Sequence, residues 1–133
     1  MSDHVFSNFK LGNMLLKNRI VMAPMTRSRC PNNLPNPLVA QYYQQRAEAG
    51  LIITEGTVID RPGSKMAPDV PNFFGAALDG WKNVVEKVHA AGGQIVPQIW
   101  HVGNVGMAKG WEPSKIDSPS GYIMPDKQNT EPM

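Results

Sequence analysis

The chain has 133 residues, of which 41% are hydrophobic and 18% are charged, and its formal net charge is +2. This length and apolar content suffice for one modest domain with a core of its own. Lysine and arginine are scattered along the chain, which argues against a nucleic-acid or anionic-membrane partner. The single cysteine, Cys30, excludes an internal disulfide framework and fits a reducing compartment.

Two further observations concern location. The first residues include an acid and lack the apolar stretch of a secretory signal peptide. No apolar run approaches the roughly 20 residues that a membrane-spanning helix needs. We therefore expect a cytoplasmic protein with neither a membrane nor a nucleic-acid partner.

The first predicted element is a hairpin within residues 1–18. Apolar residues between Phe9 and Leu16 flank Gly12-Asn13, and this pair suits a tight turn because both residues tolerate positive φ. Residues 19–23 then form a mostly apolar run that stops at Pro24. This pattern predicts a buried strand whose C-terminal end opens into a loop.

A helix and a second strand follow that loop. Asn36-Pro37 offers a capping residue with proline at the first helical position, and Gly50 is a suitable stop. Leu38 and the residues at helical spacing from it share one face up to Ala49. Residues 51–54 are apolar and predict a strand that opens into residues 55–57.

A second helix and a third strand complete the pattern. After a proline-bearing loop, Asp79 is a capping candidate, and Trp81 begins an apolar i, i+3, i+4, i+7 series that ends at Gly92. Residues 95–100 predict the third strand. Residues 104–133 are polar and proline-rich, and we expect them to form a loop-rich tail.

The order strand, helix, strand, helix, strand predicts an α/β fold with parallel strands. A doubly wound dinucleotide-binding sheet would carry a glycine-rich turn after its first strand, but residues 23–29 contain no glycine. In a (β/α)8 TIM barrel, functional groups gather at the C-terminal strand ends. Those ends carry Thr26, Gly56 and Gln98, so the sequence favours the barrel.

Four stretches, in this order, resemble the N-terminal part of the Old Yellow Enzyme family. They are residues 17–27 (KNRIVMAPMTR), residues 45–57, residues 80–93 and residues 98–103. The resemblance implies an oxidoreductase with FMN as cofactor and NAD(P)H as reductant. Such an ene-reductase transfers hydride from flavin N5 to a small-molecule activated alkene.

The resemblance also assigns five residues to the flavin. Pro24 and Met25 resemble residues whose backbone packs beside the isoalloxazine ring, and Thr26 resembles the hydroxyl that hydrogen-bonds flavin O4. Gly56 resembles the small residue that lets the ring approach the backbone. Gln98 resembles the amide that pairs with the pyrimidine edge, which requires both a donor and an acceptor.

One residue is assigned to the substrate and none to a metal. Trp100 resembles the aromatic that lines the substrate cavity above the flavin. No histidine, cysteine or acid has metal-ligand spacing, and the family's catalytic proton donor has no counterpart here. Two positions depart from the expected pattern: Pro97 removes a backbone donor from a central strand, and Asn104 stands where the family has arginine.

A full (β/α)8 barrel needs about 250 residues and eight strands, whereas this chain has 133 residues and three strand candidates. We therefore expect an N-terminal fragment of a single FMN-binding barrel, with the hairpin and about three βα units. One hypothesis is an enzyme segment that carries part of the flavin site. Another is a non-catalytic truncated or split-barrel fragment, which needs a complementary chain or a second copy. A third is the dienoyl-CoA or amine-dehydrogenase branch, although no cysteine cluster here supports its iron–sulfur site.

Overall fold

The computed structural model describes residues 4–61, 64, 68–103, 122–124 and 127–128. Within these residues, no helix has the length and apolar character needed to cross a membrane. Most of the tail predicted to be loop-rich lies outside the described ranges. The part of it that is described forms two short antiparallel strands, β6 (Tyr122–Met124) and β7 (Lys127–Gln128).

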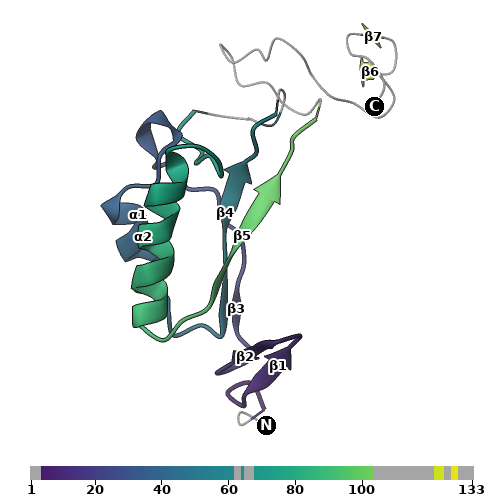
Figure 1. Ribbon diagram of the computed structural model, residues 1–133. Coiled ribbons are helices and arrows are strands. Elements are labelled where there is room, and N and C mark those ends of the chain that lie inside the picture. Colours follow the sequence, from purple (N-terminus) through teal and green to yellow (C-terminus); the bar gives the residue numbers. More distant parts are fainter. Residues whose placement is uncertain (1–3, 62–63, 65–67, 104–121, 125–126, 129–133) are drawn as a thin grey trace.

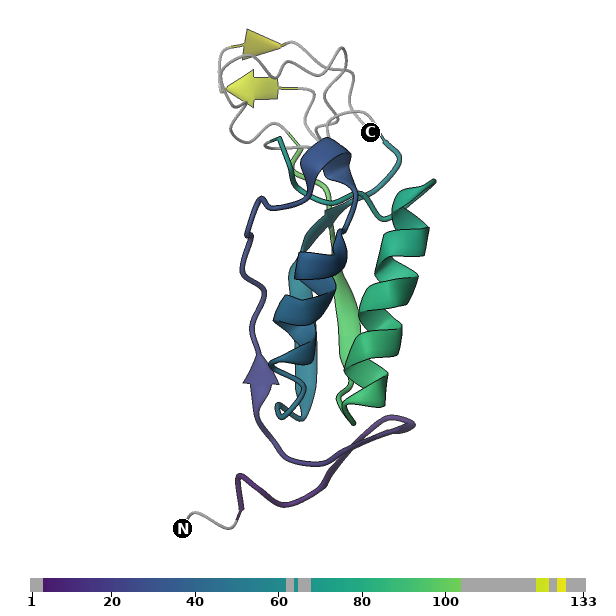
Figure 2. The ribbon, with the colours of Figure 1, turned by 90° about the vertical axis from the view of Figure 1, so that its left-hand side faces the viewer.

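The main body is a parallel three-stranded sheet with two helices on one face (Figure 1, Figure 2). The strands lie in the order β3 (Val21–Met22), β4 (Leu51–Val58) and β5 (Ile95–Trp100). The helices are α1 (Pro37–Gln44) and α2 (Ala77–Ala90). The predicted alternation of strands and helices is therefore confirmed, and the strands are parallel as expected for crossover connections.

Several boundaries differ from the prediction. The strand expected over residues 19–23 pairs only at Val21 and Met22, while β4 runs four residues beyond the apolar stretch that predicted it. The first helix ends at Gln44, short of the predicted stop at Gly50, and residues 45–48 form turns. The second begins at Ala77, so Asp79 lies in its first turn and is not its cap.

The predicted cap of the first helix is confirmed. The Asn36 side chain accepts hydrogen bonds from the backbone N–H groups of Leu38 and Val39, at 3.0 and 3.2 Å. Pro37 follows at the first helical position, where its missing N–H is not needed. The sequence signal at this helix start was local, and the structure follows it.

The core lies between the helices and the sheet. Trp81, Val84 and Val88 of α2 pack there with Tyr43 of α1 and Ile52 of β4. The indole N–H of Trp81 donates to the carbonyl of Asn72 at 2.8 Å, so its one polar atom is satisfied inside the core. This packing holds both helices against β4, the middle strand.

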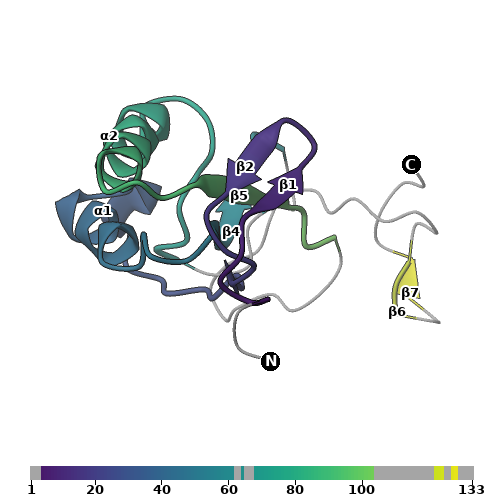
Figure 3. The same ribbon diagram turned by 90° about the horizontal axis from the view of Figure 1, so that it is seen from below.

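The predicted hairpin is also confirmed. It consists of β1 (Phe9–Leu11) and β2 (Met14–Leu16), joined through Gly12 at a φ of 57°. Figure 1 and Figure 3 show it across the end of the sheet where the parallel strands begin. The opposite end of the sheet, where the strands finish, therefore remains clear of it.

A β-bulge interrupts the pairing of β4 with β5. The register joins Ile53 to Val96 and then Gly56 to Gln98, so two residues of β4 face Pro97 alone. A proline has no N–H to donate to the ladder, and a bulge is one of the few places in a sheet that tolerate it. The Thr54 hydroxyl accepts the Gln98 N–H at 3.1 Å and restores a contact across the bulge.

Candidate functional site

The C-terminal ends of β4 and β5 bring three of the six predicted site residues together. Gly56 lies opposite Gln98 in the register, and Trp100 follows two residues later on the same strand. The hydroxyl of Thr57 donates to the Gln98 carbonyl at 2.9 Å, which ties the two strand ends beyond the bulge. The paired strands therefore define the relative positions of these side chains.

Gly56 is buried, and the structure shows why a side chain would not fit there. A Cβ atom built on Gly56 would overlap ring atoms of the Trp100 indole. A real Cβ would therefore force the indole or the strand to move. We predicted a flavin ring against this glycine, whereas in the structure the residue packed there is Trp100.

The other three predicted residues follow β3 in an irregular loop. Pro24 is half-buried, while Thr26 is exposed and Met25 is 46% exposed. Pairing of this segment with β4 ends at Met22, so the ladder does not hold the loop. The structure thus places these three residues after a strand end, as predicted. Unlike Gly56 and Gln98, they are not held by pairing between strands.

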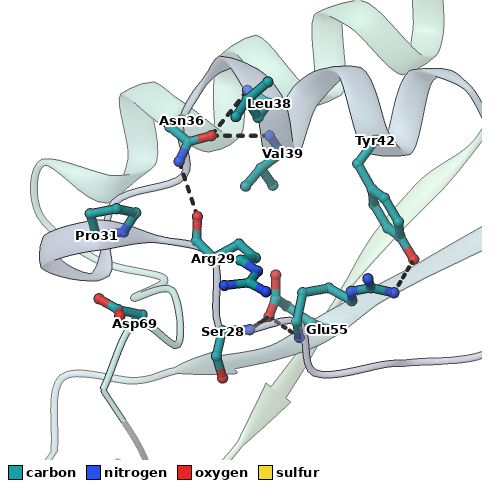
Figure 4. A pocket seen from close by; sticks show the side chains of 10 residues that line it. Ser28, Arg29, Pro31, Asn36, Leu38, Val39, Tyr42, Glu55 and Asp69 are labelled. Atoms are coloured by element: carbon teal, nitrogen blue, oxygen red, sulfur yellow. Dashed lines mark hydrogen bonds between the residues drawn. The ribbon is translucent and has the colours of Figure 1, made fainter.

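One attachment of the loop is Glu55, which was not predicted as a site residue from the sequence. One oxygen of its carboxyl, Oε2, accepts the backbone N–H groups of Arg27 at 2.8 Å and Ser28 at 3.3 Å (Figure 4). Its own backbone N–H donates to the Tyr43 hydroxyl at 2.8 Å. Glu55 therefore connects β4, α1 and the loop that carries Thr26.

The electrostatic environment of Glu55 is unusual for a glutamate. The side chain is 1% exposed, and burial raises the pKa of the carboxyl, while the bonds from Arg27 and Ser28 lower it. Its second oxygen, Oε1, is buried and has no hydrogen-bond partner in the described part of the chain. An acid at the end of an apolar strand run was the available sequence signal.

A cavity of about 490 Å³ lies beside this carboxyl (Figure 4). Its wall includes Arg27 and Ser28 from the loop, Tyr42 from α1, Glu55 and Asp69. None of the six predicted site residues lines it. The cavity is therefore separate from the predicted flavin contacts. Glu55 lines the cavity and also bonds the loop that carries Thr26.

Cys30 is buried in the core beneath the loop. Burial, together with the nearby acids Glu55 and Asp69, raises the pKa of its thiol to about 12. A thiol with so high a pKa is protonated near neutral pH and is a poor nucleophile. Within the described residues, no group of three or more histidine, cysteine and acidic side chains could hold a metal ion.

The polar groups of the strand-end residues suit a flat ligand with donors and acceptors. In the described part of the chain, neither the Gln98 amide nor the Thr26 hydroxyl makes a hydrogen bond, and the buried indole N–H of Trp100 has no partner. An amide can donate and accept at once, and a flavin pyrimidine edge requires both. The residues present therefore fit FMN.

The chain resembles known proteins in both sequence and structure. Residues 4–132 match the NADH:flavin oxidoreductase / NADH oxidase family. The chain is 44% identical over 101 residues to 12-oxophytodienoate reductase 7 of Oryza sativa subsp. japonica, an alignment that covers 74% of this chain and 25% of that protein.

Solved structures agree with this match. Morphinone reductase aligns with 86% of this chain at 43% identity and a TM-score of 0.78, and the aligned part is 31% of its own length. The Old Yellow Enzyme homologue from Zymomonas mobilis aligns with 86% at 35% identity and a TM-score of 0.78, over 32% of its length. The chain thus spans between a quarter and a third of these relatives.

Proposed function

The chain belongs to the NADH:flavin oxidoreductase / NADH oxidase family, and from that premise we propose that it supplies part of the FMN site of an ene-reductase. Its strands β3, β4 and β5 are the first strands of a (β/α)8 barrel. The whole protein reduces activated alkenes with NAD(P)H in this proposal. Because the relatives are named for different compounds, the substrate is proposed only as a class of small-molecule alkene.

One observation carries the proposal. The register of β4 and β5 places a glycine, an amide and an indole N–H at neighbouring strand ends, and neither polar group has a hydrogen-bond partner among the described residues. In a barrel, the C-terminal strand ends are where ligands bind. Without a ligand, a buried donor such as the Trp100 N–H is costly, on the order of 1–3 kcal/mol.

We assign the residues to their roles as follows. Gln98 binds the pyrimidine edge, Thr26 donates to O4, and the backbone at Pro24 and Met25 packs beside the ring. Gly56 leaves room at the strand end, and Trp100 borders the substrate cavity. When bound, FMN supplies the hydride carrier between NAD(P)H and the alkene, while these residues orient it and exclude water.

The second candidate is a partial barrel that works only with a complementary chain or a second copy. It is favoured by the outer strands β3 and β5, each of which pairs on one side only among the described residues. Apolar side chains are exposed on these strands, including Val21 and Ile99. Unpaired edges of this kind invite further strands. For either candidate, we propose a cytoplasmic location.

The test uses this chain alone and mixed with the part of morphinone reductase that follows the matched region. We call this mixture the completed barrel. Flavin absorbance that stays with the completed barrel after gel filtration supports the proposal, and its absence from a folded mixture given FMN contradicts it. A band with the chain alone would contradict only the need for a partner.

Gln98→Leu tests the assigned contact. We expect the dissociation constant of FMN from the completed barrel to rise roughly tenfold or more, because a hydrogen-bonding pair at the ring edge is lost. Gln41→Leu, the same change at an exposed position on α1, is the matched control. Equal FMN affinity in both variants would leave Gln98 with no role in binding.

A further inference from the structure

We propose that Glu55 is a positioning residue of the flavin site, because its buried carboxyl sets where the Thr26 segment lies relative to Gly56. The inference rests on the proposed function in one respect: it takes Thr26 as a flavin contact. Glu55 itself touches neither flavin nor substrate in this proposal. It acts through the backbone of the loop.

The bulge in β4 sets the direction of the Glu55 side chain. Thr54 and Glu55 are the two bulge residues opposite Pro97, and bulges redirect side chains. The Glu55 backbone N–H is held by the Tyr43 hydroxyl of α1 at 2.8 Å. Tyr43 is itself fully buried in the core, so the base of the Glu55 side chain rests on packed structure.

The Glu55 carboxyl holds two successive backbone amides of the loop. Its Oε2 accepts both the Arg27 and the Ser28 N–H groups. Ser28 has a φ of 50°, in the left-handed region that costs a non-glycine residue energy. A carboxyl oxygen that accepts two successive backbone amides is well suited to stabilise this conformation, because the two bonds hold the peptide units on both sides of Arg27.

One of the held amides is linked directly to Thr26 through a shared peptide unit. The N–H of Arg27 belongs to the peptide unit between Thr26 and Arg27, and that unit is planar. Fixing this N–H therefore restrains the plane that contains the Thr26 Cα, and the side chain that carries the hydroxyl projects from this Cα. Gly56 follows Glu55 directly in β4, so one residue connects two parts of the proposed flavin site.

The second oxygen of the Glu55 carboxyl is also buried. Oε1 is buried without a partner in the described residues, and Glu55 lines the cavity beside the loop. An apolar residue could pack this strand end without the cost of desolvating a carboxyl, so packing alone does not explain an acid here. The hydrogen bonds to the loop offer a reason for its presence.

The experiment measures hydrogen exchange of the Arg27 and Ser28 amides by NMR in the full chain. In Glu55→Leu we expect both amides to exchange roughly tenfold faster or more. Glu55→Gln should retain most of the protection, because an amide oxygen accepts the same bonds. Glu86→Leu, at an exposed position on α2, is the matched control and should change neither amide.

Protection in Glu55→Leu equal to that of the wild type would overturn the proposal. If Glu55→Leu does not fold, the proton shifts of the two amides decide the matter during an acid titration. A common titration step in the wild type that disappears in Glu55→Gln supports the contact. Without a common step, the contact is wrong.

The link to the flavin is tested separately in the completed barrel. We expect Glu55→Leu to weaken FMN binding roughly tenfold and to shift the flavin absorbance band, with partial rescue by Glu55→Gln. Faster amide exchange with unchanged FMN affinity and spectrum would refute the positioning role. If even the wild-type mixture binds no FMN, the proposed function fails, whereas the exchange result on the loop stands.

Discussion

The strand-borne half of the candidate site, around Gly56 and Gln98, can be compared with the loop-borne half around Thr26. In the first half, pairing of β4 with β5 fixes the positions through the backbone. In the second, pairing has already ended, and side-chain contacts hold the loop, including those of Glu55 with its backbone and of Arg27 with Tyr42. We therefore expect changes to the contacts between β4 and β5 to reduce stability, and changes in the loop half to alter ligand binding with little loss of stability.

The largest effect should come from Gly56→Val. The added side chain overlaps the Trp100 indole, and such overpacking costs about 3 kcal/mol. The measurement is the free energy of unfolding by denaturant. The double variant with Trp100→Ala should recover part of the loss, because it removes the overlap. Wild-type stability in Gly56→Val would show that the indole does not pack there.

A smaller loss should follow from Thr54→Val. The hydroxyl that accepts the Gln98 N–H across the bulge is replaced by a methyl group of similar size. An unsatisfied donor remains, which costs about 1–2 kcal/mol. Denaturant unfolding again reports the change. If the loss does not exceed that of Thr26→Val, the same replacement at an exposed position, the bulge contact contributes nothing.

The pH dependence of stability should expose the attachment of the loop. Burial raises the pKa of Glu55, which lies beside Arg27, Tyr43 and Cys30, so the folded state favours the protonated carboxyl. Its contribution is complete below the ordinary glutamate pKa and is lost as pH rises through the raised value. The unfolding midpoint of the wild type should therefore fall relative to that of Glu55→Gln as the pH rises. A constant difference would contradict the raised pKa.

The smallest effect on stability should come from Thr26→Val. Thr26 is exposed, so the free energy of unfolding should change by no more than about 0.5 kcal/mol. FMN binding by the completed barrel should nevertheless weaken by roughly fivefold, because the proposed bond to O4 is lost. A loss of stability without a loss of affinity would reverse the contrast between the two halves.

The same contrast explains what could be predicted from the sequence. The order of elements, the hairpin turn at Gly12 and the Asn36 cap depend on local patterns, and the structure confirms them. The length of β4 was underestimated because Glu55 and Thr57 are polar and Gly56 disfavours a strand, and only pairing with β5 shows that they belong to it. Tertiary pairing overrode a local signal.

Glu55 could not be assigned from the sequence for a related reason. Its role depends on two amides that lie 27 and 28 residues away along the chain, and on the direction that the bulge gives its side chain. Pro97 indicated that normal pairing would fail near this point, but not that the extra residue would lie in β4. The roles of Thr26, Gln98 and Trp100 as ligand contacts remain proposals.

The bulge opposite Pro97 also bears on the redox chemistry of the proposed site. Strict alternation from Ile53 would pair Glu55 with Gln98 and turn a carboxyl toward the place that Gly56 now occupies. A negative charge there would repel the electrons that a flavin accepts, and so would lower its reduction potential. By advancing the alternation by one residue, the bulge puts an uncharged glycine at this position and turns the acid to the loop.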